Sequence, residues 1–146
     1  MPMDTRSLRS LSLSTIALAR QFGVRITAEQ LEEKIARGQV SSTRELSKTF
    51  NEQGIKLQLL KPNLKTLTSR SYYFPCVALL RDGTSKILIN CSQNAEGVFE
   101  FQSIDPLDPS NKVVVEKEDE FKKTWNGSVY LVSRETGVSS QDRIFD

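Results

Sequence analysis

The chain has 146 residues, of which 38% are hydrophobic and 26% charged, a composition that indicates neither a disordered nor a membrane-embedded class. Its 20 basic and 18 acidic residues are interspersed and leave a net charge of +2, so the sequence lacks the basic blocks of a nucleic-acid-binding protein. It contains no histidine, which excludes any Ser-His, Cys-His or His-metal mechanism carried by this chain alone.

The first 54 residues are predicted to be helical. Small and apolar residues at spacings of three and four between Leu8 and Phe22 mark one face of a first helix. The patterns Thr27-Ala-Glu-Gln30 and Ser42-Thr-Arg-Glu45 are capping boxes that open a second and a third helix. Each of these helices is expected to end at a glycine: Gly23, Gly38 and Gly54.

After Gly54 the apolar pattern changes to the period of two that is typical of strands. Strands are predicted at 55–59, on both sides of an Asp82-Gly83 turn within 74–90, and at 99–102, 113–115 and 128–133. Short helices are predicted at 63–68 and 118–125, and turns at 94–97, 105–109 and 126–127. Helices followed by mostly consecutive antiparallel strands predict an α+β fold.

The hairpin within 74–90 organises this prediction. A two-residue turn at Asp82-Gly83 would pair Arg81 with Thr84 and Leu80 with Ser85. Continuing this register would pair further residues across the hairpin and put four apolar side chains on one face with Ser85 at its end: Ala78, Leu80, Ile87 and Ile89. Lys86 would then point to the opposite face as a solvated surface charge.

The two cysteines, Cys76 and Cys91, flank the hairpin without metal-binding spacing. In the predicted register they are diagonal neighbours, so a bridge is conceivable, but two reduced and buried thiols are the favoured interpretation. No metal site is expected. The first residues lack the basic start and apolar core of a secretory signal, so a cytosolic location is expected.

The order of these features resembles the C39 peptidase domain of bacterial ABC exporters. The resemblance extends from about Leu8 to Arg134 and is carried by the end of the first helix at Gly23 and by residues 74–89, 104–109 and 119–131. It implies the papain-like cysteine protease fold of the C39 type, with N-terminal helices packed on a C-terminal, mostly antiparallel sheet. Residues 1–134 would form this domain, and residues 135–146 a polar tail or a linker towards a transmembrane domain.

Active members of that family cut a double-glycine leader with a Cys, a His and an Asp that precedes a Pro. The resemblance places Ser10 at the Cys position and Ser85 at the His position, and only Asp105 matches. Asp4 lies near the place of an expected Gln. A serine hydroxyl without a base is a weak nucleophile, and Lys86 is disfavoured as that base because it points away. Asp105 also has a plainer interpretation, as the opening residue of a turn before Pro106.

A C39 domain without Cys and His resembles the C39-like domains of hemolysin-type exporters in type I secretion systems. The resemblance implies that the domain does not cleave but binds the unfolded secreted protein, such as an RTX-type toxin, at the cytoplasmic face of the bacterial inner membrane. The partners would be that protein and the rest of a homodimeric ABC transporter, with no nucleic acid. The candidate substrate-binding residues are Ser10, Tyr72, Tyr73, Phe74, Leu79, Ser85 and Asp105.

No cofactor is expected in this domain, because ATP and Mg²⁺ would belong to an ATPase domain outside the chain and the sequence has no Walker A pattern. Two alternatives stay open: a residual peptidase that uses Ser10, and a purely structural brace of the transporter. The aromatic residues Tyr72, Tyr73 and Phe74 are either part of the core or an exposed recognition patch.

Overall fold

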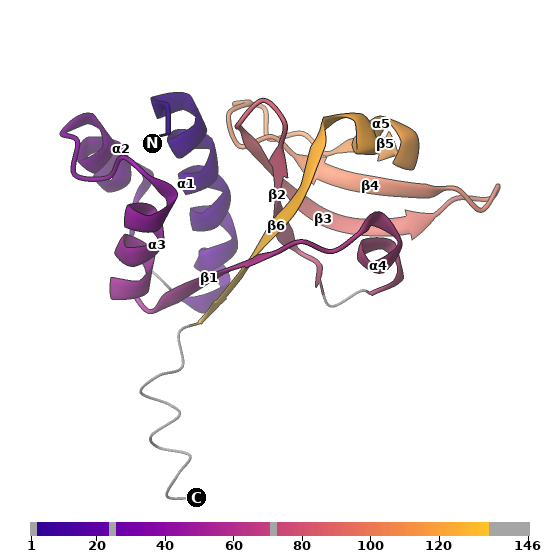
Figure 1. The fold of residues 1–146 in the computed structure, drawn as a ribbon, viewed down its shortest axis with the longest axis horizontal. Coiled ribbons are helices and arrows are strands. Elements are labelled where there is room, and N and C mark those ends of the chain that lie inside the picture. The colour runs from indigo at the N-terminus through magenta and orange to yellow at the C-terminus, as the bar shows by residue number, and fades with distance from the viewer. Residues whose placement is uncertain (1–2, 24–25, 71–72, 135–146) are drawn as a thin grey trace, which may run out of the picture.

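Three helices at the N-terminal end pack beside a six-stranded sheet in the computed structural model, which describes residues 3–23, 26–70 and 73–134 (Figure 1). The expected tail at 135–146 and the candidate Tyr72 lie outside the described residues. The helices are α1 (Thr5–Ala19), a 3-10 turn at Arg20–Phe22, α2 (Ala28–Ala36), α3 (Thr43–Glu52), α4 (Leu64–Ser69) and α5 (Glu118–Thr124). The strands are β1 (Ile55–Leu60), β2 (Cys76–Leu80), β3 (Ser85–Gln93), β4 (Phe99–Ile104), β5 (Val114–Lys117) and β6 (Trp125–Arg134).

The predicted helix boundaries are largely confirmed by their caps. Thr27 and Gln30 form the reciprocal capping box, with Gln30 N donating to Thr27 Oγ1 at 3.2 Å and Thr27 N donating to Gln30 Oε1 at 3.0 Å. At α3 the Ser42 hydroxyl accepts from Glu45 N, but the Glu45 carboxylate accepts from Ser41 N instead of from Ser42 N. Helix α1 begins earlier than expected, because Asp4 caps it by accepting from Ser7 N.

The sheet has the strand order β1-β6-β2-β3-β4-β5, and every pairing is antiparallel. Strands β2 to β5 follow one another as a meander, whereas β6 returns from the end of the described chain to lie between β1 and β2 (Figure 1). The expected α+β class is therefore confirmed. The predicted turn at Asn126-Gly127 is wrong: β6 already begins at Trp125, and these residues form an irregularity in its pairing with β2, where Gly127 has a φ of 97°.

The predicted register of the hairpin is also wrong, by one residue. Leu79 faces Ser85 and Cys76 faces Leu88, because the loop has three residues instead of two. Leu80 N donates to Thr84 O at 2.9 Å, and Gly83 N donates to Leu80 O at 3.0 Å. Gly83 closes the loop with a φ of 91°, which is the left-handed position of a three-residue hairpin turn. Ser85 consequently lies on one face with Val77 and Ile87, and not with Ala78 and Leu80.

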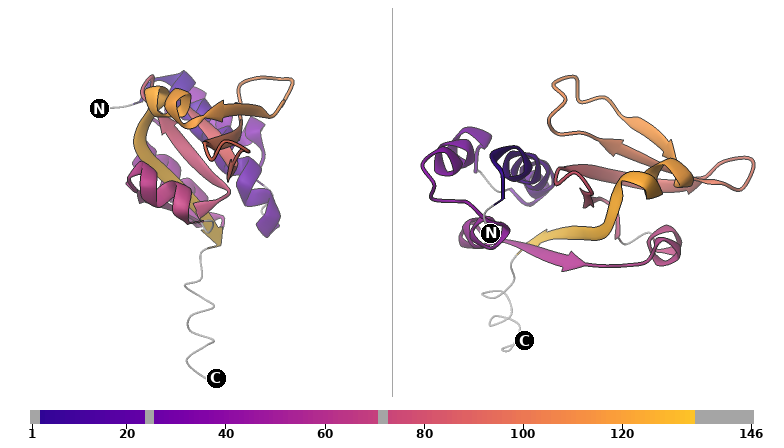
Figure 2. Two further views of the ribbon diagram at one scale, coloured as in Figure 1. Left: turned by 90° about the vertical axis from the view of Figure 1, so that its right-hand side faces the viewer. Right: turned by 45° about the horizontal axis from the view of Figure 1, so that its top comes forward.

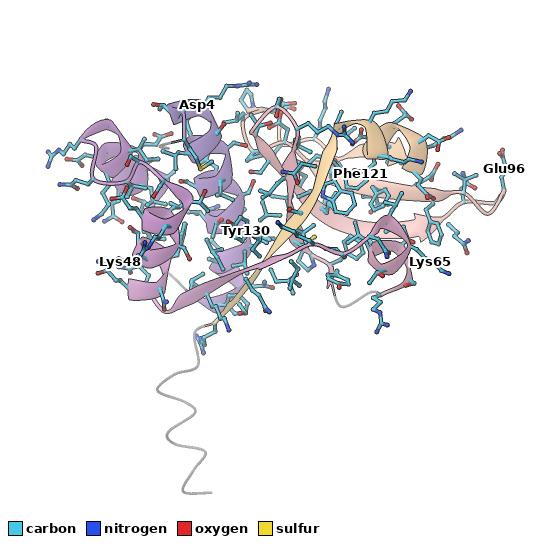
Figure 3. The ribbon with its side chains drawn as sticks, viewed as in Figure 1. Asp4, Lys48, Lys65, Glu96, Phe121 and Tyr130 are labelled. Atoms are coloured by element: carbon cyan, nitrogen blue, oxygen red, sulfur yellow. The ribbon has the colours of Figure 1, made fainter. Side chains whose placement is uncertain are left out.

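The two faces of the sheet carry separate hydrophobic clusters. The first joins α1, α2 and α3 to Val77, Ile87 and Tyr130 of the sheet. The second lies on the opposite face and joins Leu67 of α4 and Phe121 of α5 to alternate strand residues (Figure 3). The helical layer therefore covers only part of one face, and the far end of β3, β4 and β5 extends beyond it (Figure 2).

Candidate functional site

Ser10 of α1 and Ser85 at the start of β3 lie in direct contact, although 75 residues separate them in the chain. Ser10 Oγ accepts from Ser85 N at 2.8 Å and lies 3.0 Å from Ser85 O and 3.2 Å from Ser85 Oγ. Both side chains are buried, with 0% and 2% of their surface exposed. The two positions that the resemblance pairs as nucleophile and base are thus brought together, and they bind each other.

Small residues close the seam between α1 and the hairpin on both sides of this contact. Ser14, one turn further along α1, lies with its hydroxyl 3.3 Å from Ser85 Oγ. At the other end Gly83 approaches Ser7 so closely that a Cβ on the glycine would lie 2.7 Å from Ser7 Oγ. Hydroxyl groups and a missing side chain therefore let the helix and the hairpin tip approach without leaving an open cleft at Ser10.

The remaining predicted site residues fall into two places. Leu79 faces Ser85 across the hairpin and packs half-buried against the first cluster. Asp105 lies in the exposed turn after β4, where its Oδ1 accepts from Leu107 N at 2.9 Å, as its turn-opening interpretation predicts. Asp105 and Ser85 line one cavity of about 270 Å³. Tyr73 and Phe74 lie elsewhere and pack, buried and half-buried, in the second cluster.

Lys86 differs from the prediction of a solvated charge. It points away from Ser85, as expected, but it is only 9% exposed and forms an ion pair with Glu116 of β5. Its ammonium group also lies 5.2 Å from the centre of the Phe121 ring, which favours the cation. Sequence reasoning missed Glu116, because its partner Lys86 lies 30 residues away in the chain and no local pattern links the two.

The family model of the Peptidase C39 family matches residues 4–137. The chain belongs to the C39 peptidase family. Members of this family are normally cysteine peptidases. Comparison with curated protein sequences finds no significant match.

Solved C39 domains share the fold of this chain. The peptidase C39-like domain of the toxin secretion ATP-binding protein from Vibrio parahaemolyticus is 18% identical, with a TM-score of 0.62 over 86% of this chain and 96% of that one. A double-glycine-motif protease of an AMS/PCAT transporter, in complex with its leader peptide, is 15% identical with a TM-score of 0.68 over 90% and 89%. The peptidase domain of Streptococcus ComA, a bi-functional ABC transporter, is 20% identical with a TM-score of 0.66 over 90% and 94%.

In this C39 domain neither cysteine lies at the seam. Cys76 is fully buried in β2 on the face away from α1, and burial raises the pKa of its thiol to about 12. Burial and the nearby Glu118 carboxylate raise the pKa of the Cys91 thiol to about 11. Both are free thiols, and because the thiolate is the reactive form, neither has the environment of a nucleophile at neutral pH.

Two further properties bear on the site. Among the residues that the structure describes, no group of three or more Cys, Asp or Glu side chains could hold a metal ion. None of the helices described is long and apolar enough to cross a membrane.

Proposed function

We propose that this C39 domain does not cleave, and that it binds the unfolded secreted protein of a bacterial type I secretion ABC exporter and positions it for transport. The observation that carries the proposal is the closed contact of Ser10 with Ser85 in a chain without histidine. The expected cargo class is the RTX-type toxin.

The chemistry of the seam supports a domain without peptidase activity. A serine hydroxyl needs an adjacent base to become a nucleophile, whereas the hydroxyl of Ser10 forms its hydrogen bonds with the backbone and the hydroxyl of Ser85. Lys86 is engaged by Glu116 on the opposite face, and Asp105 is bound to the backbone of its own turn. The retained Asp105 has no imidazole to orient, because the chain has none.

The similar structures support an exporter context. They include a domain of a toxin secretion ATP-binding protein and a protease bound to its leader peptide. On this proposal the domain lies at the cytoplasmic face of the inner membrane as part of a homodimeric transporter. Residues 135–146 would lead from the domain at 1–134 to a transmembrane domain, and ATP and Mg²⁺ would bind to an ATPase domain elsewhere in that protein.

A cleavage assay separates this proposal from a residual peptidase. The purified chain is incubated with a double-glycine leader peptide, and the products are followed by mass spectrometry, with the Ser10→Ala variant beside it. We expect no cleavage by either protein. Cleavage that the Ser10→Ala substitution abolishes would establish a serine peptidase and overturn the proposal.

A titration separates the proposal from a purely structural brace. The isotope-labelled chain is titrated with the unfolded and the folded form of the toxin encoded beside it, and amide shifts are followed by NMR. We expect shifts with the unfolded form and far smaller ones with the folded form. No response to either form would favour the brace, and equal responses would contradict a preference for unfolded chains.

A further inference from the structure

Strand β5 forms one edge of the described sheet and carries an unusual apolar surface. Three consecutive residues, Val113, Val114 and Val115, are 53%, 39% and 54% exposed. Among the described residues, they make up all the exposed large hydrophobics except Leu59 at the opposite edge. Exposed apolar edges invite pairing with further strands, and proteins usually blunt them with charges or prolines; here Lys112 and Lys117 lie at the two ends, and the three valines between them stay apolar. A row of exposed valines at an open edge therefore points to a strand that pairs there.

The two faces of this edge differ in chemistry. Val115 lies opposite Gln102 and shares its side of the strand with Lys117, and the exposed Val113 directly precedes the strand. Val114 and Glu116 point to the other side and line the cavity of about 270 Å³ that also contains Ser85 and Asp105. The other lining groups that can form hydrogen bonds are Thr84, Lys86, Ser103 and Thr124. One side of β5 therefore exposes Val115 and Lys117, and the other side leads into a cavity with several hydroxyl groups.

We propose that an extended segment of the exported polypeptide adds to β5 as a further strand of the sheet. The inference rests on the proposed function and names the surface at which the unfolded chain is held. Main-chain hydrogen bonds to the free edge would supply the affinity, and alternate side chains the selectivity. Residues beside Val115 would be apolar, and those beside Val114 would be short side chains with hydroxyl or amide groups that reach the cavity.

The position of β5 favours this occupant over a second copy of the chain. The cavity beside Val114 is also lined by Ser85 and Asp105, so a segment held at this edge lies next to two of the positions that the C39 resemblance singles out. Strand β5 has only 4 residues, of which the exposed Lys117 is the last, and the exposed Lys112 lies two residues before it. Pairing of two such short strands would not supply the roughly 1,600 Å² that a stable dimer buries, whereas a transient contact with a passing chain needs less area.

The test uses a soluble peptide of alternating valine and threonine, blocked at both ends and flanked by lysines. It is titrated into the isotope-labelled 146-residue chain, and amide shifts and hydrogen exchange are followed by NMR. We expect shifts and slower exchange at Val114 to Lys117 and at the partner strand β4. A second peptide has the same side chains, but the backbone nitrogens that would face β5 are methylated. It is expected to bind about tenfold more weakly, since it cannot donate main-chain hydrogen bonds to the strand.

Two variants localise the effect. Val115→Lys replaces an exposed valine in the middle of the edge with a charge and is expected to weaken binding about tenfold, whereas Leu59→Lys makes the matched change at the other edge and is expected to leave it unchanged. Shifts centred on β1 or on the helices, equal binding of the N-methylated peptide, or equal binding by both variants would overturn the proposal. So would a dimer of the free chain in sedimentation equilibrium that Val115→Lys dissociates.

The outcomes also separate this proposal from the proposed function. If the unfolded toxin binds the wild type and Val115→Lys equally well, the β5 assignment is wrong and the receptor function remains. If the peptide pairs with β5 but the unfolded toxin does not bind the domain, the edge site stands and the receptor function is wrong.

Discussion

Ser85 and Lys86 are neighbours in the chain, but they point to opposite faces of β3 and meet opposite surroundings. The side chain of Ser85 points toward α1, where its hydroxyl contacts the neutral hydroxyl groups of Ser10 and Ser14. Lys86 enters the other face, where it pairs with Glu116 and lies over the ring of Phe121. The Lys86–Glu116 pair is therefore held on one side of the sheet and the contact of Ser85 with α1 on the other.

This difference shows why proximity in sequence is a poor guide to a catalytic pair. A strand places successive side chains on opposite faces, so the lysine that follows Ser85 can take no proton from it. The face that carries the serines is closed by small side chains, and the opposite face is stabilised by aromatic stacking around a buried ion pair. Substitutions on the two faces should consequently differ in how much they lower the free energy of unfolding and in the interaction that they remove.

The largest effect is expected at Phe121. Its ring is fully buried and stacks on Phe101 at 4.1 Å and on Trp125 at 5.3 Å between ring centres. Phe121→Ala should lower the free energy of unfolding by about 4 kcal/mol, because it leaves a cavity in the second cluster. Urea denaturation followed by circular dichroism measures this loss. Val113→Ala, at a side chain that is 53% exposed, is the control and should cost less than about 0.5 kcal/mol.

The second-largest loss of stability is expected at the Lys86–Glu116 ion pair on the same face. Glu116→Gln leaves the ammonium of Lys86 without its partner at a side chain that is 11% exposed, and should cost about 3 kcal/mol in urea denaturation. Glu33→Gln removes the same kind of charge from the pair with Arg37, whose side chains are 59% and 66% exposed. That control should cost less than about 0.5 kcal/mol. Equal losses would show that the charge on the α5 face is not held in a buried environment.

The serine seam should give a smaller loss. Ser10→Ala removes the oxygen that accepts from the buried Ser85 N and should cost about 2 kcal/mol, since that donor stays buried and unpaired. Ser14→Ala removes only the longer hydroxyl contact and serves as the matched variant, with an expected cost of about 1 kcal/mol. Thermal unfolding of both proteins compares them. A neutral Ser10→Ala would mean that hydrogen bonds do not hold the seam closed.

Helix caps outside both faces should contribute less again. Thr27→Ala breaks the capping box of α2 on an exposed surface and should cost about 1 kcal/mol. Thr27→Ser keeps the accepting hydroxyl and should retain most of the stability. Thermal unfolding of the pair tests this, and a loss at Thr27→Ser equal to that of alanine would assign the effect to the methyl group instead of the cap.

The smallest effect is expected at the hairpin tip, as a function of pH. The hydroxyl and the backbone N–H of Thr84 donate to Asp82 and lower the pKa of its carboxyl group from 3.8. The ionised carboxylate therefore adds stability that is fully present above pH 3.8 and is lost as the pH falls through the lowered pKa of the folded state. Wild type and Asp82→Asn should differ in thermal stability at neutral pH and converge in acid; a constant difference would contradict this assignment.

Much of the fold could be predicted because its signals are local. The caps at Thr27 and Ser42 and the glycine after Phe22 mark helix ends through bonds between residues a few positions apart. The alternation in 55–59 and 99–102 likewise predicts strands through side-chain direction alone. The candidate site was partly predictable as well: Ser10 and Ser85 meet, as the resemblance implies.

The errors arose where long-range packing decides. An Asp-Gly pair suits both a two-residue and a three-residue hairpin loop. In the structure the loop has three residues, and Gly83 at its end lies against Ser7 of α1. Lys86 would be a surface charge on an isolated hairpin, and only Glu116, 30 residues further along the chain, gives it a buried partner. The composition of Asn126-Gly127 predicts a turn. In the structure β6 pairs with β2 on both sides of these two residues, which therefore form an irregularity within the strand.

The sequence by itself determined the starts of the second and third helices, the alternation of the strands, the α+β class and the absence of any imidazole chemistry, because these depend on neighbouring residues or on composition. Only the tertiary structure decided which face Ser85 and Lys86 occupy, that β6 lies between β1 and β2, and that the valines of β5 end the described sheet. These properties depend on contacts between segments far apart in the chain, and a one-residue change of register exchanges the two faces of a strand.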